Sequence, residues 1–174
     1  MCSSDLTYRL GRGELPEEEY TLPIGQAEVK RAGENITIVT YGLMLHYCLE
    51  AAEVMAGEGT DVEVVDLRTL RPLDKETVLN SVKKTGKLPI VHEDNVTGGV
   101  GAEIAALVAD EAFEYLNGPV TRLCGPDVPT MPFAQTLEDE YMPNTDKIAH
   151  ALRKHAAYLR LVVRDWRCIF CFLT

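Results

Sequence analysis

The residues best suited to chemistry lie in one stretch that reads H-E-D-N-V-T-G-G-V-G-A-E. His92 and Glu93 directly follow an apolar run, at a predicted strand end where a general acid or base can be built. Gly98, Gly99 and Gly101 then lead into a helical pattern, where free backbone N–H groups are able to cradle an anion. No nucleophile, second catalytic carboxylate or phosphate-binding motif lies near this stretch in the sequence. A structural or interface role is therefore favoured for the histidine and the glutamate, and close backbone packing at a subunit contact for the glycines.

A second polar stretch, D-L-R-T-L-R-P-L-D, runs from Asp66 to Asp74 after another apolar run. Its Arg68 and Arg71 are expected to form ion pairs that fix loops or a partner chain, because catalytic use would need a bound cofactor. Asp74 is predicted to cap the helix that follows. Asp127, within G-P-D-V-P, is most simply a turn former among prolines. Loops of this kind are expected at the carboxyl ends of the strands, where ligands and partner chains usually bind in open parallel sheets.

Strand patterns and helix patterns alternate along the chain. Apolar runs rich in β-branched residues predict the strands, and apolar residues at helical spacing predict the helices between them. Such alternation favours right-handed βαβ units. The predicted fold is α/β, a three-layer sandwich with a mostly parallel five-stranded sheet and helices on both faces. The predicted strands are residues 27–30, 36–40, 62–67, 88–92 and 120–124, the predicted helices are 43–56, 74–86, 102–116 and 144–157, and a long Pro-rich loop is expected over 125–143.

Both ends of the chain differ from this central pattern. The polar lead-in, residues 1–23, has no periodicity and is interpreted as a linker, so the folded domain is expected over 24–157. The tail, residues 158–174, changes character abruptly, and two alternatives stay open for it: a non-native end of a truncated gene, or a native packing or oligomer segment. Cys168 and Cys171 have the spacing of a redox or half-metal site, but a second Cys or His pair does not accompany them, which disfavours a metal.

The composition excludes several classes of function. A chain of 174 residues with 46% hydrophobic content is able to bury one sizeable core. Its net charge of −10 argues against a nucleic-acid partner and suits solubility or a basic protein partner. Five cysteines are an odd number without framework spacing, which predicts a reducing compartment and a cytoplasmic location. No apolar stretch reaches the roughly 18 residues of a membrane span, so a membrane protein is not expected.

Several blocks of the sequence together resemble one family closely. They lie in the family's order between Tyr8 and Lys154, and they include V-T-Y-G, E-V-V-D-L-R-T-L-R-P-L-D, the stretch from His92 to Ala106, G-P-D-V-P-T-M-P-F-A and L-E-D-E-Y-M-P-N. The family is the beta subunit of the thiamine-diphosphate-dependent 2-oxo acid dehydrogenases, of the pyruvate and branched-chain types, and the match is to its carboxyl-terminal domain. The resemblance implies a fragment of an enzyme that decarboxylates a 2-oxo acid and passes the acyl group to lipoamide.

The same resemblance places the chemistry outside this chain. In the family, an alpha subunit binds the diphosphate of the cofactor, and the amino-terminal domain of the beta subunit holds the aminopyrimidine ring and a catalytic histidine. None of His46, His92, His150 and His155 matches the motif of that histidine. The resemblance therefore implies no catalytic, cofactor-binding or metal-binding residue here, with thiamine diphosphate and Mg²⁺ belonging to the intact enzyme, and the isolated chain is expected to be inactive.

The role implied by the resemblance is assembly. The expected partners are the alpha subunit, a second beta subunit and the subunit-binding domain of the dihydrolipoyl acyltransferase, and we also expect the chain to self-associate. Two alternatives stay open, namely the carboxyl-terminal domain of deoxyxylulose-phosphate synthase or transketolase, and a free-standing interaction module. The candidate interface residues are Arg68, Arg71, Asp74, His92, Glu93, Gly98, Gly99, Gly101, Glu103 and Asp127.

Overall fold

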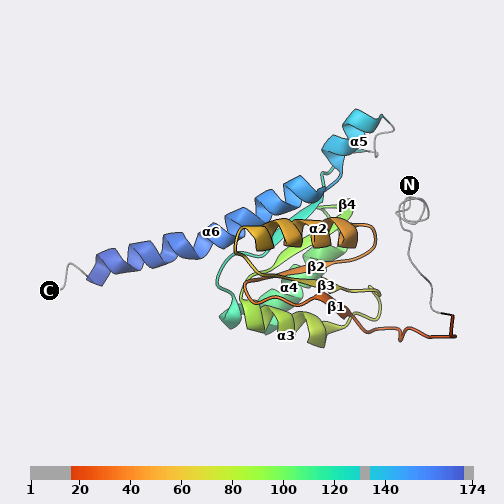
Figure 1. Ribbon diagram of the computed structural model, residues 1–174, viewed down its shortest axis with the longest axis horizontal. Coiled ribbons are helices and arrows are strands. Elements are labelled where there is room, and N and C mark those ends of the chain that lie inside the picture. The colour runs from red at the N-terminus through yellow and green to blue at the C-terminus, as the bar shows by residue number, and fades with distance from the viewer. Residues whose placement is uncertain (1–16, 130–133, 171–174) are drawn as a thin grey trace.

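A five-stranded sheet forms the centre of the molecule. The computed structural model describes residues 17–129 and 134–170, with the side chains left out at 135 and over 159–170. The strand order is β1-β3-β2-β4-β5; β1 is antiparallel to β3, and the other neighbours are parallel. This architecture confirms the predicted α/β fold with a mostly parallel sheet (Figure 1). The strands are β1 (Glu28–Arg31), β2 (Ile36–Thr40), β3 (Val62–Asp66), β4 (Pro89–Asn95) and β5 (Thr121–Gly125).

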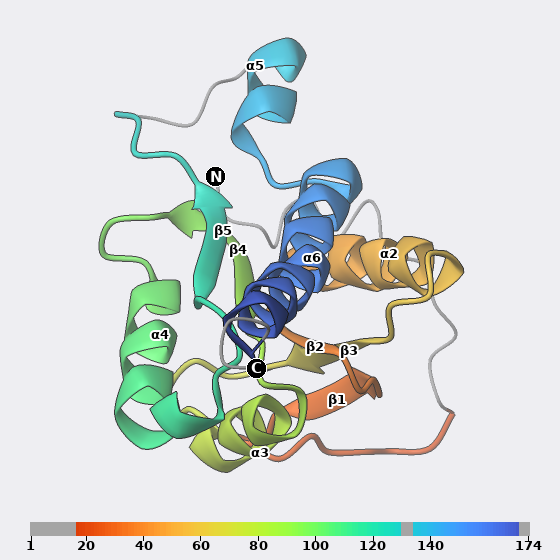
Figure 2. The same cartoon turned by 90° about the vertical axis from the view of Figure 1, so that its left-hand side faces the viewer.

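Helices cover both faces of the sheet, which makes the three layers that were predicted (Figure 2). Every residue of β2 and β3 is buried, as expected for central parallel strands with a helix layer on each side. The helices α2 (Met44–Gly57) and α6 (Thr145–Phe170) pack on one face. The helices α3 (Lys75–Thr85) and α4 (Val100–Glu111) pack on the other.

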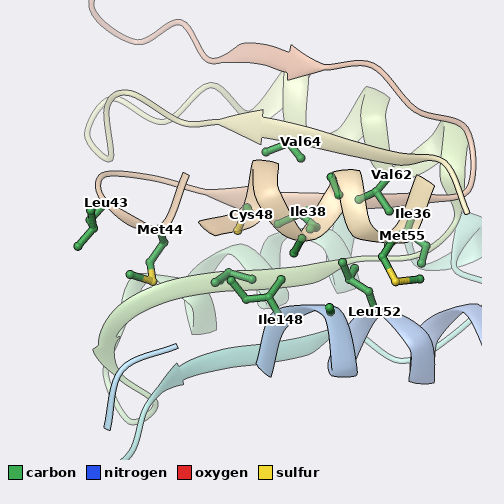
Figure 3. Close-up of a cluster of buried hydrophobic side chains, with 14 residues drawn as sticks. Ile36, Ile38, Leu43, Met44, Cys48, Met55, Val62, Val64, Ile148 and Leu152 are labelled. Carbon is green, nitrogen blue, oxygen red and sulfur yellow. The ribbon is translucent and has the colours of Figure 1, made fainter. Parts of the chain in front are cut away.

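The face beneath α2 and α6 is almost entirely apolar. Alternate residues of the central strands point to it, because successive side chains of a strand lie on opposite faces. Successive turns of the two helices contribute apolar side chains to the same cluster (Figure 3). The cluster fixes α6 across the sheet through Ile148 and Leu152, and its other large members are Ile36, Ile38, Leu43, Met44, Cys48, Met55, Val62, Val64 and Val91.

The face beneath α3 and α4 buries polar groups as well. The hydroxyl of Thr37 donates to the carbonyl of Ser81 at 3.1 Å and lies 2.8 Å from the hydroxyl of Thr85. The carboxylate of Glu63, only 1% exposed, pairs with the ammonium of Lys84 from α3. These contacts join β2 and β3 to α3 and give partners to polar groups that would be costly to bury alone, the Oε2 of Glu63 among them.

Most predicted boundaries lie within two residues of the observed ones, and four larger differences occur. β4 continues to Asn95, because Asn95 still pairs with Gly125 of β5, so His92 and Glu93 lie inside the strand rather than at its end. The helix predicted to reach residue 116 stops at Glu111. A 3₁₀ turn, η1 (Phe113–Tyr115), follows it.

The other two differences lie in the last third of the chain. A short helix, α5 (Gln135–Tyr141), occupies part of the predicted loop, since the run Q-T-L-E-D-E-Y contains neither Gly nor Pro. The last helix does not stop at residue 157 but continues to Phe170. A change of composition is not a stop signal, and residues 145–170 also lack Gly and Pro.

Candidate functional site

The loops that carry the predicted site residues lie at the carboxyl edge of the parallel strands. The structure divides them into two groups along that edge. The last part of β4, with His92, and the three glycines that follow the strand lie beside the segment after β5, with Asp127. The loop after β3, with Arg68 and Asp74, instead meets the lead-in before β1.

His92 is the centre of the first group. Its ring is 1% exposed and stacks on Tyr41, with 5.9 Å between the ring centroids and 18° between the planes. Its Nε2 accepts a hydrogen bond from the backbone N–H of Gly101 at 3.2 Å and lies 3.1 Å from Sγ of Cys124. Burial is the main reason why the pKa of His92 is lowered, with the Asp94 carboxylate acting in the opposite direction. The ring is therefore held neutral with its acceptor nitrogen already engaged.

The groups around His92 are kept neutral too. Burial raises the pKa of the Cys124 thiol to about 11 and, with the charges of Asp94 and Glu93, that of Tyr41 to about 12. A nucleophilic cysteine needs the opposite shift, because the thiolate is the reactive form. The Cys124–His92 contact is thus a packed polar contact rather than an activated pair.

The glycines of the β4–α4 loop allow α4 to start directly on the His92 ring. A Cβ added to Gly101 would lie 2.5 Å from Nε2 of His92, and one on Gly99 would lie 2.8 Å from Cε1 of the same ring. Gly98 has a φ of +79°, a conformation that side chains rarely adopt. Gly99 is the N-cap of α4 and its φ is ordinary, so space rather than backbone angle demands glycine there. The close packing that the sequence favoured occurs within the chain itself.

Asp127 ties the segment after β5 to the β4–α4 loop. Its carboxylate accepts from the backbone N–H of Thr97 at 3.0 Å and from the Thr97 hydroxyl at 2.6 Å. These bonds lower the pKa of Asp127. Nearby, the Tyr141 hydroxyl donates to the side-chain carbonyl of Asn95 at 3.0 Å, which joins α5 to the same loop. Asp127 is therefore a bridge between two loops as well as part of a turn.

The second group fixes the start of the domain. Asp74 caps α3, as predicted, because its side chain accepts from the N–H of Thr77 at 3.1 Å. The same carboxylate accepts from the N–H of Ala27 at 2.9 Å. The pKa of Asp74 is lowered by these hydrogen bonds against an opposing effect of burial. Arg68, with a φ of +56°, pairs with Glu28 of β1.

The remaining predicted residues lie apart from these contacts. Glu93 is half-buried in β4, and Glu103 is exposed in the first turn of α4. Arg71 is exposed and precedes a cis peptide bond to Pro72. Contact of any of the ten candidate residues with a partner chain stays a prediction. Within the described residues, no group of three or more His, Cys, Asp or Glu side chains is arranged to hold a metal ion.

A groove that the sequence analysis missed lies between β5 and the first half of α6. It encloses about 530 Å³ and combines an apolar floor with cationic side chains. The sequence did carry a signal for it, because Lys147, His150 and Lys154 follow one another at helical spacing on one face of α6. We call this feature the basic groove, and its lining residues are Pro119, Thr121, Arg122, Leu123, Lys147, His150, Ala151, Lys154, His155 and Tyr158.

The fold is a three-layer α/β domain, and at its carboxyl edge Asp74, His92 and Asp127 accept hydrogen bonds from the chain's own backbone. The family model described as "Transketolase, C-terminal domain" matches residues 25–148. The chain belongs to this transketolase C-terminal domain family.

The relatives that resemble this chain include beta subunits of 2-oxo acid dehydrogenases and related enzymes. The chain is 46% identical over 151 residues to the 2-oxoisovalerate dehydrogenase subunit beta of Bacillus subtilis, which covers 87% of this chain and 46% of that protein. It is 48% identical over 138 residues to the mitochondrial pyruvate dehydrogenase E1 subunit beta of Dictyostelium discoideum, covering 79% and 38%. The chain thus spans about half the length of these relatives or less.

A solved structure has the same fold. It is described as a split-gene transketolase in an inactive beta4 tetramer, and it aligns with a TM-score of 0.71 at 29% identity. The alignment covers 83% of this chain and 46% of that one. Among the described helices of the present chain, none has the length and apolar character needed to cross a bilayer.

Proposed function

We propose that the chain is the assembly domain of a beta subunit of a thiamine-diphosphate-dependent 2-oxo acid dehydrogenase. The complete enzyme would decarboxylate pyruvate or a branched-chain 2-oxo acid oxidatively and transfer the acyl group to lipoamide. The proposed partners are an alpha subunit, a second beta subunit and the subunit-binding domain of the acyltransferase. Identities of 46% and 48% to beta subunits, over most of this chain, support this proposal more than the transketolase alternative, whose solved neighbour is 29% identical.

The side chains at the carboxyl edge carry the proposal of assembly instead of catalysis. A magnesium diphosphate needs several free oxygen ligands, whereas the carboxylates of Asp74 and Asp127 are engaged by backbone N–H groups and threonine hydroxyls. His92 is buried with its acceptor nitrogen engaged. The described residues therefore do not fit a thiamine diphosphate site, and we assign the cofactor and its Mg²⁺ to other parts of the enzyme.

An acidic and aromatic surface around η1 is suited to a basic partner. Phe113 is 73% exposed, which is unusual for a large apolar side chain. Exposed Asp110 and Glu114 flank it in the sequence, in a chain of net charge −10. Aromatic anchors surrounded by charges are common in protein interfaces. We propose this surface as the docking site for the acyltransferase subunit-binding domain, and we place the protein in the cytoplasm, in accord with the free thiols of Cys48 and Cys124.

Calorimetric titration of the chain with an acyltransferase subunit-binding domain tests this function. We expect one saturable site whose affinity falls as salt is added, because the attraction between opposite charges is screened. Glu114→Lys should weaken binding, while Glu53→Lys, an equal charge change at an exposed position of α2, serves as the matched control. Absence of binding by the wild-type chain at low salt, or an equal loss in both variants, would contradict the proposed docking.

A further inference from the structure

The basic groove concentrates positive charge on a strongly acidic molecule. Arg122 and Lys147 already donate to backbone carbonyls, the former to Val96 at 2.9 Å and the latter to three carbonyls at the end of α5. His150 and Lys154 are exposed, and neither makes an ion pair or a hydrogen bond within the described part of the chain. Their side chains are therefore available to an acidic ligand.

The floor of the basic groove offers apolar contacts beside these charges. Leu123, Ala151 and Tyr158 line it, and β5 is the outermost strand of the described sheet. The outer edge of such a strand presents backbone N–H and C=O groups that are suited to pair with an extended segment. The groove thus fits an extended, acidic peptide that carries apolar side chains on one face.

The lead-in of this same chain has these properties. Residues 17–24 read E-E-E-Y-T-L-P-I, adopt no helix or strand, and are exposed throughout. Three glutamates come first, and then Tyr20, Leu22 and Ile24 follow at alternate positions, 58%, 58% and 78% exposed. In an extended segment, alternate side chains lie on one face. We call residues 17–24 the acidic lead-in.

The acidic lead-in lies at the opposite edge of the sheet from the groove of its own chain. It is anchored beside β1, because the N–H groups of Gly25 and Ala27 donate to Thr69 and Asp74. β1 and β5 are opposite edges of the sheet, about 19 Å apart at the usual strand spacing. To reach the groove of its own chain, the lead-in would have to leave this position and pass around a helix layer. Figure 1 shows the lead-in leaving the domain at the end opposite to the carboxyl-terminal end of α6.

We propose that the basic groove binds the acidic lead-in of a second copy of this chain. The exchange is reciprocal, so that two copies form a closed dimer in which each groove receives the other copy's glutamates and apolar side chains. Packing groove against groove is disfavoured, since it would bring like charges together. The proposal refines the self-association that belongs to the proposed function, and it names the surfaces responsible.

Sedimentation equilibrium of the full chain and of two charge variants tests the proposal. The groove variant is His150→Glu with Lys154→Glu, and the lead-in variant replaces Glu17, Glu18 and Glu19 with Lys. Each variant alone should dimerise about tenfold more weakly or worse, because like charges then meet. Mixing the two variants should restore a mixed dimer, since both contacts again join opposite charges. Lys75→Glu, on the opposite helix layer, is the charge control and should dimerise like the wild type.

The possible outcomes distinguish the contact between groove and lead-in from self-association of the chain in general. If the wild type dimerises and both variants dimerise equally well, the groove contact is wrong while assembly stands. If the mixture of folded variants shows no recovery, the reciprocal contact is wrong. A wild-type chain that stays monomeric at about 100 μM, where contacts worth about 5.5 kcal/mol would be visible, would overturn both the groove contact and self-association. Circular dichroism melts of each variant confirm that the proteins compared are folded.

Discussion

The carboxyl edge of the sheet and the basic groove differ in how their polar groups are used. At the edge, His92, Asp74 and Asp127 accept hydrogen bonds from the chain's own backbone. In the groove, His150 and Lys154 make no such bond within the described residues and point to a half-apolar surface. Residue types that suggest chemistry in the sequence can thus be engaged by the fold itself, as the Nε2 of His92 and the carboxylates of Asp74 and Asp127 are. Binding capacity remains where the chain leaves charges without partners.

The largest effect on stability is expected at Gly99, where the carboxyl edge is most tightly packed. A Cβ there would overlap the backbone carbonyl oxygen of Asn95 and crowd the His92 ring. Gly99→Ala should therefore lower the free energy of unfolding by about 3 kcal/mol, at the upper end of the usual cost of overpacking. Gly57→Ala is the matched control, because nothing lies within 4 Å of its added Cβ and it ends a helix, where alanine should stabilise by up to about 1 kcal/mol. Urea unfolding measures both, and an unchanged midpoint for Gly99→Ala would show that the loop is loosely packed.

The next effect is expected at Asp74. Its carboxylate caps α3 and also accepts from the N–H of Ala27, so that one side chain fixes both a helix start and the lead-in. Asp74→Ala should cost about 1 to 2 kcal/mol, the usual range for a lost helix cap. Asp74→Asn retains an acceptor and should recover part of this free energy. Equal unfolding midpoints for the wild type and Asp74→Ala would mean that the cap is not needed.

A smaller effect is expected from the pH dependence of stability. Burial lowers the folded-state pKa of His92 below its ordinary value of 6.5. As the pH falls through about 6.5, the unfolded chain therefore takes up a proton before the folded chain does. Stability is present above this pH and is lost progressively as the pH falls toward the folded-state pKa. His92→Gln should make the slope of unfolding free energy between pH 7 and pH 5 shallower, and an identical slope would contradict a buried neutral ring.

The sequence predicted the fold well because its signals are local. Runs such as I-T-I-V-T and V-E-V-V-D are rich in β-branched residues over the length of a buried strand, and Gly57 and Gly86 mark the ends of α2 and α3. The boundaries that were wrong depend on tertiary contacts instead. β4 extends past His92 only because Asn95 finds a partner in β5. Such pairing cannot be read from the residues of β4 alone.

The site was predicted only in part, for a related reason. The sequence placed His92, Asp127 and the glycines at one edge of the sheet, which the order of parallel strands dictates. It could not show that Cys124 lies against Nε2 of His92, since this contact joins residues 32 positions apart, nor that α4 starts close enough for the N–H of Gly101 to donate to the same atom. The basic groove was missed because its two walls, β5 and α6, meet only in the folded domain.

The central claim is that this domain serves assembly and does not hold the cofactor. Calorimetric titration of the folded chain with thiamine diphosphate, in the presence of millimolar Mg²⁺, tests it most directly. Because the carboxylates and the histidine at the carboxyl edge are engaged internally, we predict only the heat of dilution up to millimolar ligand. A one-to-one isotherm with micromolar affinity would contradict the account, since it would require a cofactor site that the edge residues do not provide.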